Sequence, residues 1–159
     1  MIHDVCQMEL KIQTDGNLIS MREFSYFHYH FVAAYSLAHE IVTKNEIRTV
    51  DELMKVSTEK LRSAISQKNN VSYYARQYTI PKEFDIYLID INRQNPIIEI
   101  LAGSIVILVL AVVFSGGKIE ITKDSFKAEL PPIGIGIKSI KDAFKSDLST
   151  IDFDKKIKS

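Results

Sequence analysis

Histidine is the side chain best suited to acid–base or metal chemistry near neutral pH, and three of the four histidines in this chain lie close together. They are His28, His30 and His39, in a segment that we expect to be helical. On a helix, His28 and His39 share a face but lie about 16 Å apart along the axis. His28 and His30 point in nearly opposite directions. The spacing therefore predicts neither a shared metal site nor an acid–base pair, and the chain contains no HExxH or CxxC motif.

Cysteine and glycine give no stronger signal for catalysis. Cys6 is the only cysteine, so an intrachain disulfide is excluded, and no cationic residue stands next to it to activate its thiol. Gly134 and Gly136 follow a proline pair and lack the lysine of a phosphate-binding loop. We therefore predict that the protein is not an enzyme and that it uses no metal and no cofactor.

One polar segment, from Ser72 to Tyr78, has a composition that could bind a ligand. Aromatic rings stack on bases, and an arginine among them can bind a phosphate. The same composition is also typical of a loop that packs across the edge of a sheet. The candidate ligand-binding residues are Tyr73, Tyr74, Arg76 and Tyr78.

The charge of the chain is balanced, with 20 basic and 20 acidic side chains and a pI near 6.9. A balanced chain has no overall field that attracts nucleic acid or anionic lipid, so any such contact must be local. No tract of like charge stands out. Beyond the tyrosine–arginine segment, the sequence carries no nucleic-acid footprint.

The stretch Ile97–Phe114, IIEILAGSIVILVLAVVF, is the most apolar part of the chain, and only Glu99 and Ser104 in it are polar. Eighteen helical residues span about 27 Å, close to the roughly 30 Å hydrocarbon core of a bilayer. A helix that is apolar on all sides lies in lipid or is wholly buried in protein. We predict a single-pass transmembrane helix over residues 96–117, with Glu99 near the headgroups.

Such a helix would contact lipid and other copies of the chain, since small residues allow close helix approach. The candidate membrane or oligomer contacts are Ile100, Gly103, Ser104, Ile107, Leu108 and Ala111. Residues 1–4 do not resemble the start of a signal peptide. The expected location is therefore an inner or cytoplasmic membrane, with the N-terminal part in the cytoplasm. The alternative is a cytoplasmic protein that buries the apolar helix.

The part before this stretch, residues 1–95, is predicted to form a small strand–helix–helix–strand domain. Ser20 with Glu23, and Thr49 with Glu52, are capping boxes that mark two helix starts. Hydrophobic periodicity then gives strands over Gln7–Thr14 and Phe84–Asn92, helices over about Met21–Thr43 and Val50–Gln67, and a loop or weak strand over Val71–Tyr78. The second strand is apolar on both faces apart from its aspartates, so we expect it to be central in a sheet.

Residues 118–159 are predicted to form a β-hairpin, an amphipathic helix and a polar tail. Apolar and charged residues alternate in Lys118–Thr122 and in Phe126–Leu130, with turn residues between them. Apolar residues at helical spacing then occur in Ile133–Lys145. The predicted fold class is α+β.

These elements favour a non-enzymatic, membrane-anchored interaction or sensor module that works as a homo-oligomer. One alternative is a soluble homo-oligomeric binding protein in which the apolar helix is core and the strands on both sides of it share one sheet. Another is a membrane-perturbing effector subunit that assembles through the same helix.

Overall fold

The computed structural model describes residues 5–16, 18–66, 70–93, 96–145 and 151–158. The prediction about a signal peptide concerns residues 1–4 and lies outside the described residues. Within the described residues the chain forms an α+β fold, as predicted, with six strands in one sheet.

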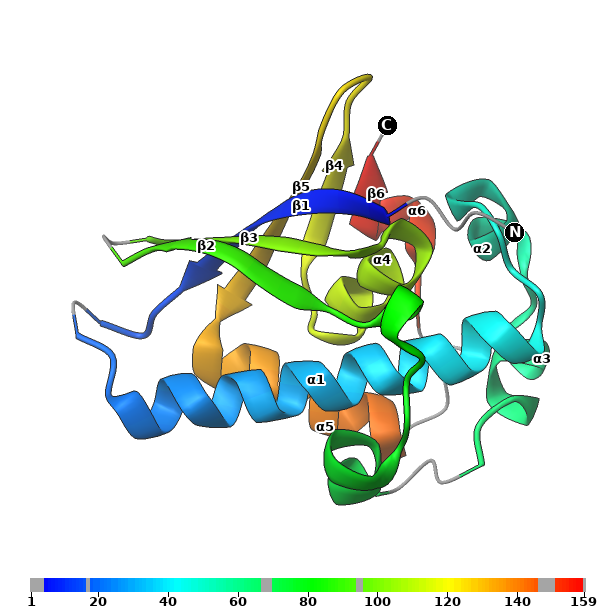
Figure 1. The fold of residues 1–159 in the computed structure, drawn as a ribbon, viewed down its shortest axis with the longest axis horizontal. Coiled ribbons are helices and arrows are strands. Elements are labelled where there is room, and N and C mark those ends of the chain that lie inside the picture. The colour runs from blue at the N-terminus through cyan, green and yellow to red at the C-terminus, as the bar shows by residue number, and fades with distance from the viewer. Residues whose placement is uncertain (1–4, 17, 67–69, 94–95, 146–150, 159) are drawn as a thin grey trace.

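The sheet joins strands from both sides of the apolar stretch (Figure 1). Its order is β2-β3-β1-β5-β4-β6. The strands are β1 (Val5–Gln13), β2 (Tyr87–Asn92), β3 (Ile97–Ser104), β4 (Lys118–Ile121), β5 (Phe126–Pro132) and β6 (Ile157–Lys158). β1 is antiparallel to β3 and parallel to β5, while β4 is antiparallel to β5 and parallel to β6. The predicted hairpin is therefore confirmed, but it belongs to the same sheet as the N-terminal strand.

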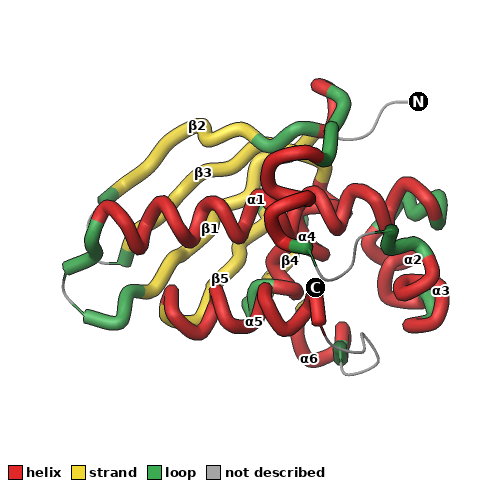
Figure 2. The backbone as a smooth tube through the Cα atoms, turned by 90° about the horizontal axis from the view of Figure 1, so that it is seen from below, coloured by secondary structure: helices red, strands yellow, loops and turns green. Residues whose placement is uncertain are grey.

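Three helices cover one face of this sheet (Figure 2). They are α1 (Met21–Lys44), α4 (Ile105–Phe114) and α5 (Ile133–Lys145). The remaining helical segments are α2 (Val50–Lys55), α3 (Thr58–Ser63), η1 (Tyr73–Gln77), η2 (Lys82–Phe84) and α6 (Phe153–Lys156). Alternate residues of β1, Met8, Leu10 and Ile12, are fully buried beneath the helices. Their neighbours in the strand lie on the opposite, uncovered face because side chains alternate along a strand.

The helix α1 begins where its capping box predicts. The Ser20 hydroxyl accepts the Glu23 backbone N–H at 3.0 Å, and Thr49 accepts the Glu52 N–H at 3.1 Å at the start of α2. These bonds satisfy donors that the first helical turn leaves without a partner. Every residue of α1 from Ala33 to Val42 is buried, because α4, α5 and η1 all pack against this helix.

The prediction of one helix over Ile97–Phe114 was wrong. The stretch divides into strand β3 and helix α4, with Ser104 in an extended conformation between them. Hydropathy alone does not distinguish an apolar strand followed by a helix from one long helix. No helix within the described ranges is both long and apolar enough to cross a membrane.

α4 is the centre of the protein core. It lies between the sheet and α1, and every residue from Val106 to Phe114 is buried. Its end forms a Schellman motif, in which Gly116 takes a φ of 76° and the Gly117 N–H donates to the Val112 carbonyl at 3.0 Å. This is the packed arrangement of the alternative interpretation, with strands on both sides in one sheet.

Three smaller predictions also need correction. The helix predicted over Val50–Gln67 divides into α2 and α3, because Val56 is extended and Ser57 caps a new helix. The segment predicted as loop or weak strand instead contains the helical turn η1. The second strand, β2, is not central but forms an edge of the sheet, where tertiary context overrides its apolar composition.

Candidate functional site

The most unusual buried charge is Glu99, which faces the helices from β3 and is only 1 % exposed. It was expected at a membrane surface, but it pairs with His28 of α1. The His28 Nε2 lies 2.6 Å from Glu99 Oε1, and its Nδ1 lies 2.7 Å from the Phe24 carbonyl oxygen. Both ring nitrogens therefore donate inside the protein, and neither is available to take a proton from a substrate. We interpret the pair as structural.

Burial opposes the charged form of His28, but the hydrogen bond and charge of Glu99, together with the Phe24 carbonyl, raise its pKa above the usual value of 6.5. A pKa that is higher in the folded protein than in the unfolded chain stabilises the fold. This stabilisation is complete at a pH below the pKa of His28 in the unfolded chain, and it is lost as the pH rises through the pKa of His28 in the folded protein. We therefore expect the difference in unfolding free energy between wild type and His28→Gln to shrink from pH 5 to pH 8. Urea unfolding at a series of pH values measures it. A difference that grows with pH would contradict this assignment.

The tyrosine–arginine residues make contacts within the protein. Tyr74 is fully buried, and its hydroxyl donates to the buried carboxylate of Glu40, which also accepts from Lys44 at 2.8 Å. The Tyr78 hydroxyl bonds His39 Nδ1 at 2.8 Å, and burial with the nearby charge of Glu40 raises the pKa of Tyr78 to about 12. These contacts fix the segment against α1.

Two members of that segment are more accessible. Tyr73 is half-buried, and Arg76 is exposed with its guanidinium 5.5 Å from the centre of the Tyr29 ring. The rings of Tyr73, Tyr74 and Tyr78 thus contact one another, while Arg76 faces α1. Ligand binding by these four residues stays a prediction.

The residues proposed for a membrane or oligomer surface do not form one. Ile107, Leu108 and Ala111 are buried in α4, and Gly103 and Ser104 are buried at the end of β3. Ile100 alone of the six is on the uncovered face of the sheet, where it is half-buried.

The uncovered face carries a regular pattern of charge that was not predicted from the sequence. Across β1, β5, β4 and β6 the register places Glu9, Lys127, Glu120 and Lys158 in one row. A second row runs through Lys11, Glu129 and Lys118. Opposite charges on directly paired residues attract each other across strands. Each glutamate therefore has a lysine on a neighbouring strand.

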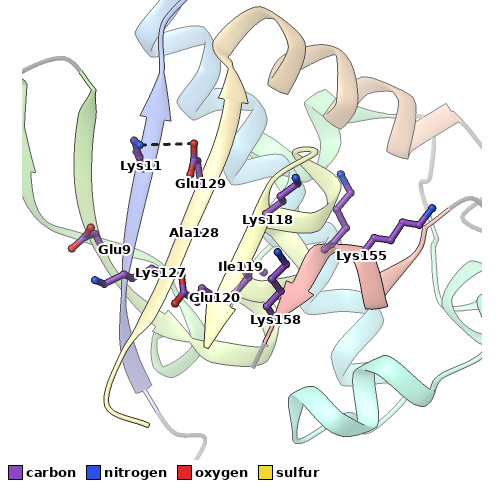
Figure 3. Close-up of a pocket in the computed structure, with 11 residues that line it drawn as sticks. Glu9, Lys11, Lys118, Ile119, Glu120, Lys127, Ala128, Glu129, Lys155 and Lys158 are labelled. Atoms are coloured by element: carbon purple, nitrogen blue, oxygen red, sulfur yellow. Dashed lines mark ion pairs between the residues drawn. The ribbon is translucent and has the colours of Figure 1, made fainter. Parts of the chain in front are cut away.

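Lysines nevertheless outnumber glutamates on this face. A hollow of about 300 Å³ lies over these strands (Figure 3). Its charged lining consists of Lys11, Lys118, Lys127, Lys155, Lys156 and Lys158 against Glu9, Glu120 and Glu129. Lys11 Nζ lies 3.8 Å from Glu129 Oε1, and Lys155 Nζ lies 4.0 Å from Asp152 Oδ2. Lys118, Lys127 and Lys158 form no ion pair with any described residue. The surplus of positive charge lies toward β4, β6 and α6.

The sequence contained part of this signal. Glu9 and Lys11, Lys118 and Glu120, and Lys127 and Glu129 occupy the polar positions of predicted strands. What the sequence could not provide was the strand order, which places β5 between β1 and β4. Lys155 and Lys156 of α6 and Lys158 of β6 join the site because β6 pairs with β4, whereas only a polar tail was predicted for this part of the chain.

The described residues contain no group of three or more His, Cys, Asp or Glu side chains that could hold a metal ion. Comparisons of the chain with protein-family models, with curated proteins and with solved structures found no match.

Proposed function

We propose that the protein is a non-enzymatic interaction module that binds an acidic segment of a partner protein on the uncovered face of its sheet. The observation that carries this proposal is the lysine surplus around the hollow of about 300 Å³. Since the whole chain is neutral, this local surplus is what would attract an anionic partner.

The chemistry of the face favours an acidic peptide over a nucleic acid. Glutamates alternate with the lysines, and they would repel a continuous phosphate backbone. The lining contains no arginine and no aromatic ring, the two side-chain types that hold phosphates bidentately and stack on bases. A peptide can place its carboxylates opposite the lysines and leave the glutamates facing solvent or basic groups.

Fluorescence anisotropy with a labelled glutamate-rich peptide tests the proposal. Lys118→Glu with Lys158→Glu should weaken binding by roughly tenfold or more, because each reversal places a repulsive charge beside the bound carboxylates. The matched control is Lys138→Glu with Lys145→Glu, which makes the same change in net charge on exposed positions of α5, on the covered side of the sheet. The control should bind nearly as wild type does at moderate salt.

Three outcomes would contradict the proposal. Wild type could fail to bind the acidic peptide, both double variants could lose affinity equally, or a single-stranded oligonucleotide of equal charge could bind more tightly than the peptide. The first would remove the binding function. Equal losses in both double variants would show that the affinity depends only on net charge. Tighter binding of the oligonucleotide would make a nucleic acid the partner instead of an acidic peptide.

A further inference from the structure

The opposite edge of the sheet, strand β2, exposes apolar side chains in an unusual place. Tyr87, Leu88 and Ile89 are 49, 52 and 53 % exposed. In the described residues β2 pairs on one side only, with β3, so its outer backbone groups have no strand beside them. An apolar edge strand is a template for pairing with another chain, and proteins normally protect such edges with charge or cover.

Both faces of β2 contribute to this apolar edge. Leu88 pairs with the buried Leu101, so it points to the helix side, whereas Tyr87 pairs with Ala102 and points to the uncovered side. Figure 2 shows that α1 runs beneath the neighbouring strands and leaves β2 without a helix over it. Leu88 therefore lacks the cover that Leu101 has.

The flank of α1 next to this edge is also apolar and open. Val32 is 38 % exposed. It lies four residues after His28, which reaches Glu99 of β3, and three before Tyr35, whose hydroxyl accepts the Ser104 N–H at 3.3 Å. Residues at these spacings share one side of a helix, so Val32 faces the β3–β2 side. Leu88 and Val32 thus belong to one uncovered strip between strand and helix.

We propose that β2 pairs antiparallel with β2 of a second copy of this chain, about a two-fold axis at Leu88. In this register Leu88 lies opposite Leu88 of the second copy, and Tyr87 lies opposite its Ile89. The two sheets become continuous, and the exposed apolar side chains of each edge cover those of the other. The contact is the same surface on both copies, as a two-fold dimer requires.

The charges at the ends of β2 complement each other in this register. Asp85 precedes the strand, and the exposed Arg93 follows it. Antiparallel pairing about Leu88 places Asp85 opposite Ile91 of the second copy. Arg93 of that copy follows two residues later, so it lies diagonally across from Asp85, within reach of a long side chain, and the same holds at both ends. A register centred on Asp90 would instead bring the two Asp90 carboxylates together. Like charges in direct opposition are destabilising, so the first register is favoured.

Sedimentation or light scattering over a concentration series tests the dimer. Wild type should show a monomer–dimer equilibrium, and Leu88→Arg should weaken the dimer by roughly tenfold to a hundredfold because it buries two unpaired charges at the axis. The matched control is Ile135→Arg, since Ile135 is 58 % exposed on α5, away from β2. A wild type that stays monomeric throughout, or a dimer that survives Leu88→Arg, would overturn the proposal.

Charge exchange tests the register without relying on the apolar contact. Arg93→Glu should weaken the dimer through repulsion from Asp85 of the second copy, and Asp85→Arg with Arg93→Glu should restore it. In a Cys6→Ser background, Leu88→Cys should also form an intermolecular disulfide on oxidation, because the two thiols meet at the axis. Ile135→Cys should form it far more slowly. Equal crosslinking at both positions, or no rescue by the exchanged pair, would refute this register.

Discussion

Leu108→Ala should lower the free energy of unfolding by about 2–5 kcal/mol, the largest effect that we expect from a single truncation. Leu108 is fully buried in α4, and α4 is enclosed by the sheet and by α1. The change removes apolar surface from the core and leaves a cavity among side chains that close packing holds in place. Denaturant unfolding measures the effect as a shift in midpoint at constant slope.

The control for Leu108→Ala is Ile135→Ala, which removes a similar volume from a residue that is 58 % exposed on α5. Surface changes of this kind are usually within about 0.5 kcal/mol of wild type. The comparison also tests the placement of α4. A loss at Leu108 as small as that at Ile135 would show that α4 is not the core of the protein.

Gly117→Ala should destabilise the protein by about 3 kcal/mol, at the upper end of the range for overpacking. A β-carbon at Gly117 would lie 2.7 Å from Leu130 Cδ2, 2.7 Å from Val112 Cγ1 and 3.0 Å from the Glu129 carbonyl oxygen. Val112 is β-branched and has little rotamer freedom in a helix. Glu129 pairs with Lys118 in the β4–β5 ladder, so its carbonyl is restrained as well.

The matched control is Gly16→Ala, since a β-carbon at Gly16 would meet no atom within 4 Å. Its effect should stay below about 0.5 kcal/mol. Thermal or urea unfolding of both variants under the same conditions provides the comparison. Equal effects at the two glycines would show that the turn after α4 is less tightly packed than the contacts of Gly117 indicate.

Local signals in the sequence predicted much of the fold. The capping residues Ser20 and Thr49 begin helices, and the alternation in 118–130 forms a hairpin. These predictions succeeded because each depends on a few neighbouring residues. The stretch 97–114 failed because its apolar character suits strand and helix equally, and the break at Ser104 depends on β3 pairing with β1, a contact from the far end of the chain.

The error about β2 has a physical cause that is relevant to function. Its residues have the composition of a central strand, which led to that prediction, yet the strand occupies an edge. The mismatch between composition and position is what motivates the proposed dimer, in which β2 becomes central between two copies. The lysine-lined face was missed for a different reason, because the residues on it come from strands distant in the sequence.

The position of β1 has a consequence for how the protein is made. β1 lies between β3 and β5, so Met8 needs Leu101 on one side and Phe126 on the other. Both partners are synthesised long after β1 leaves the ribosome. Until then the apolar side chains of β1 and α1 have no sheet to cover, and contacts between distant segments form slowly. The nascent chain therefore carries the apolar faces of β1 and α1 at least partly uncovered until residue 132 has emerged.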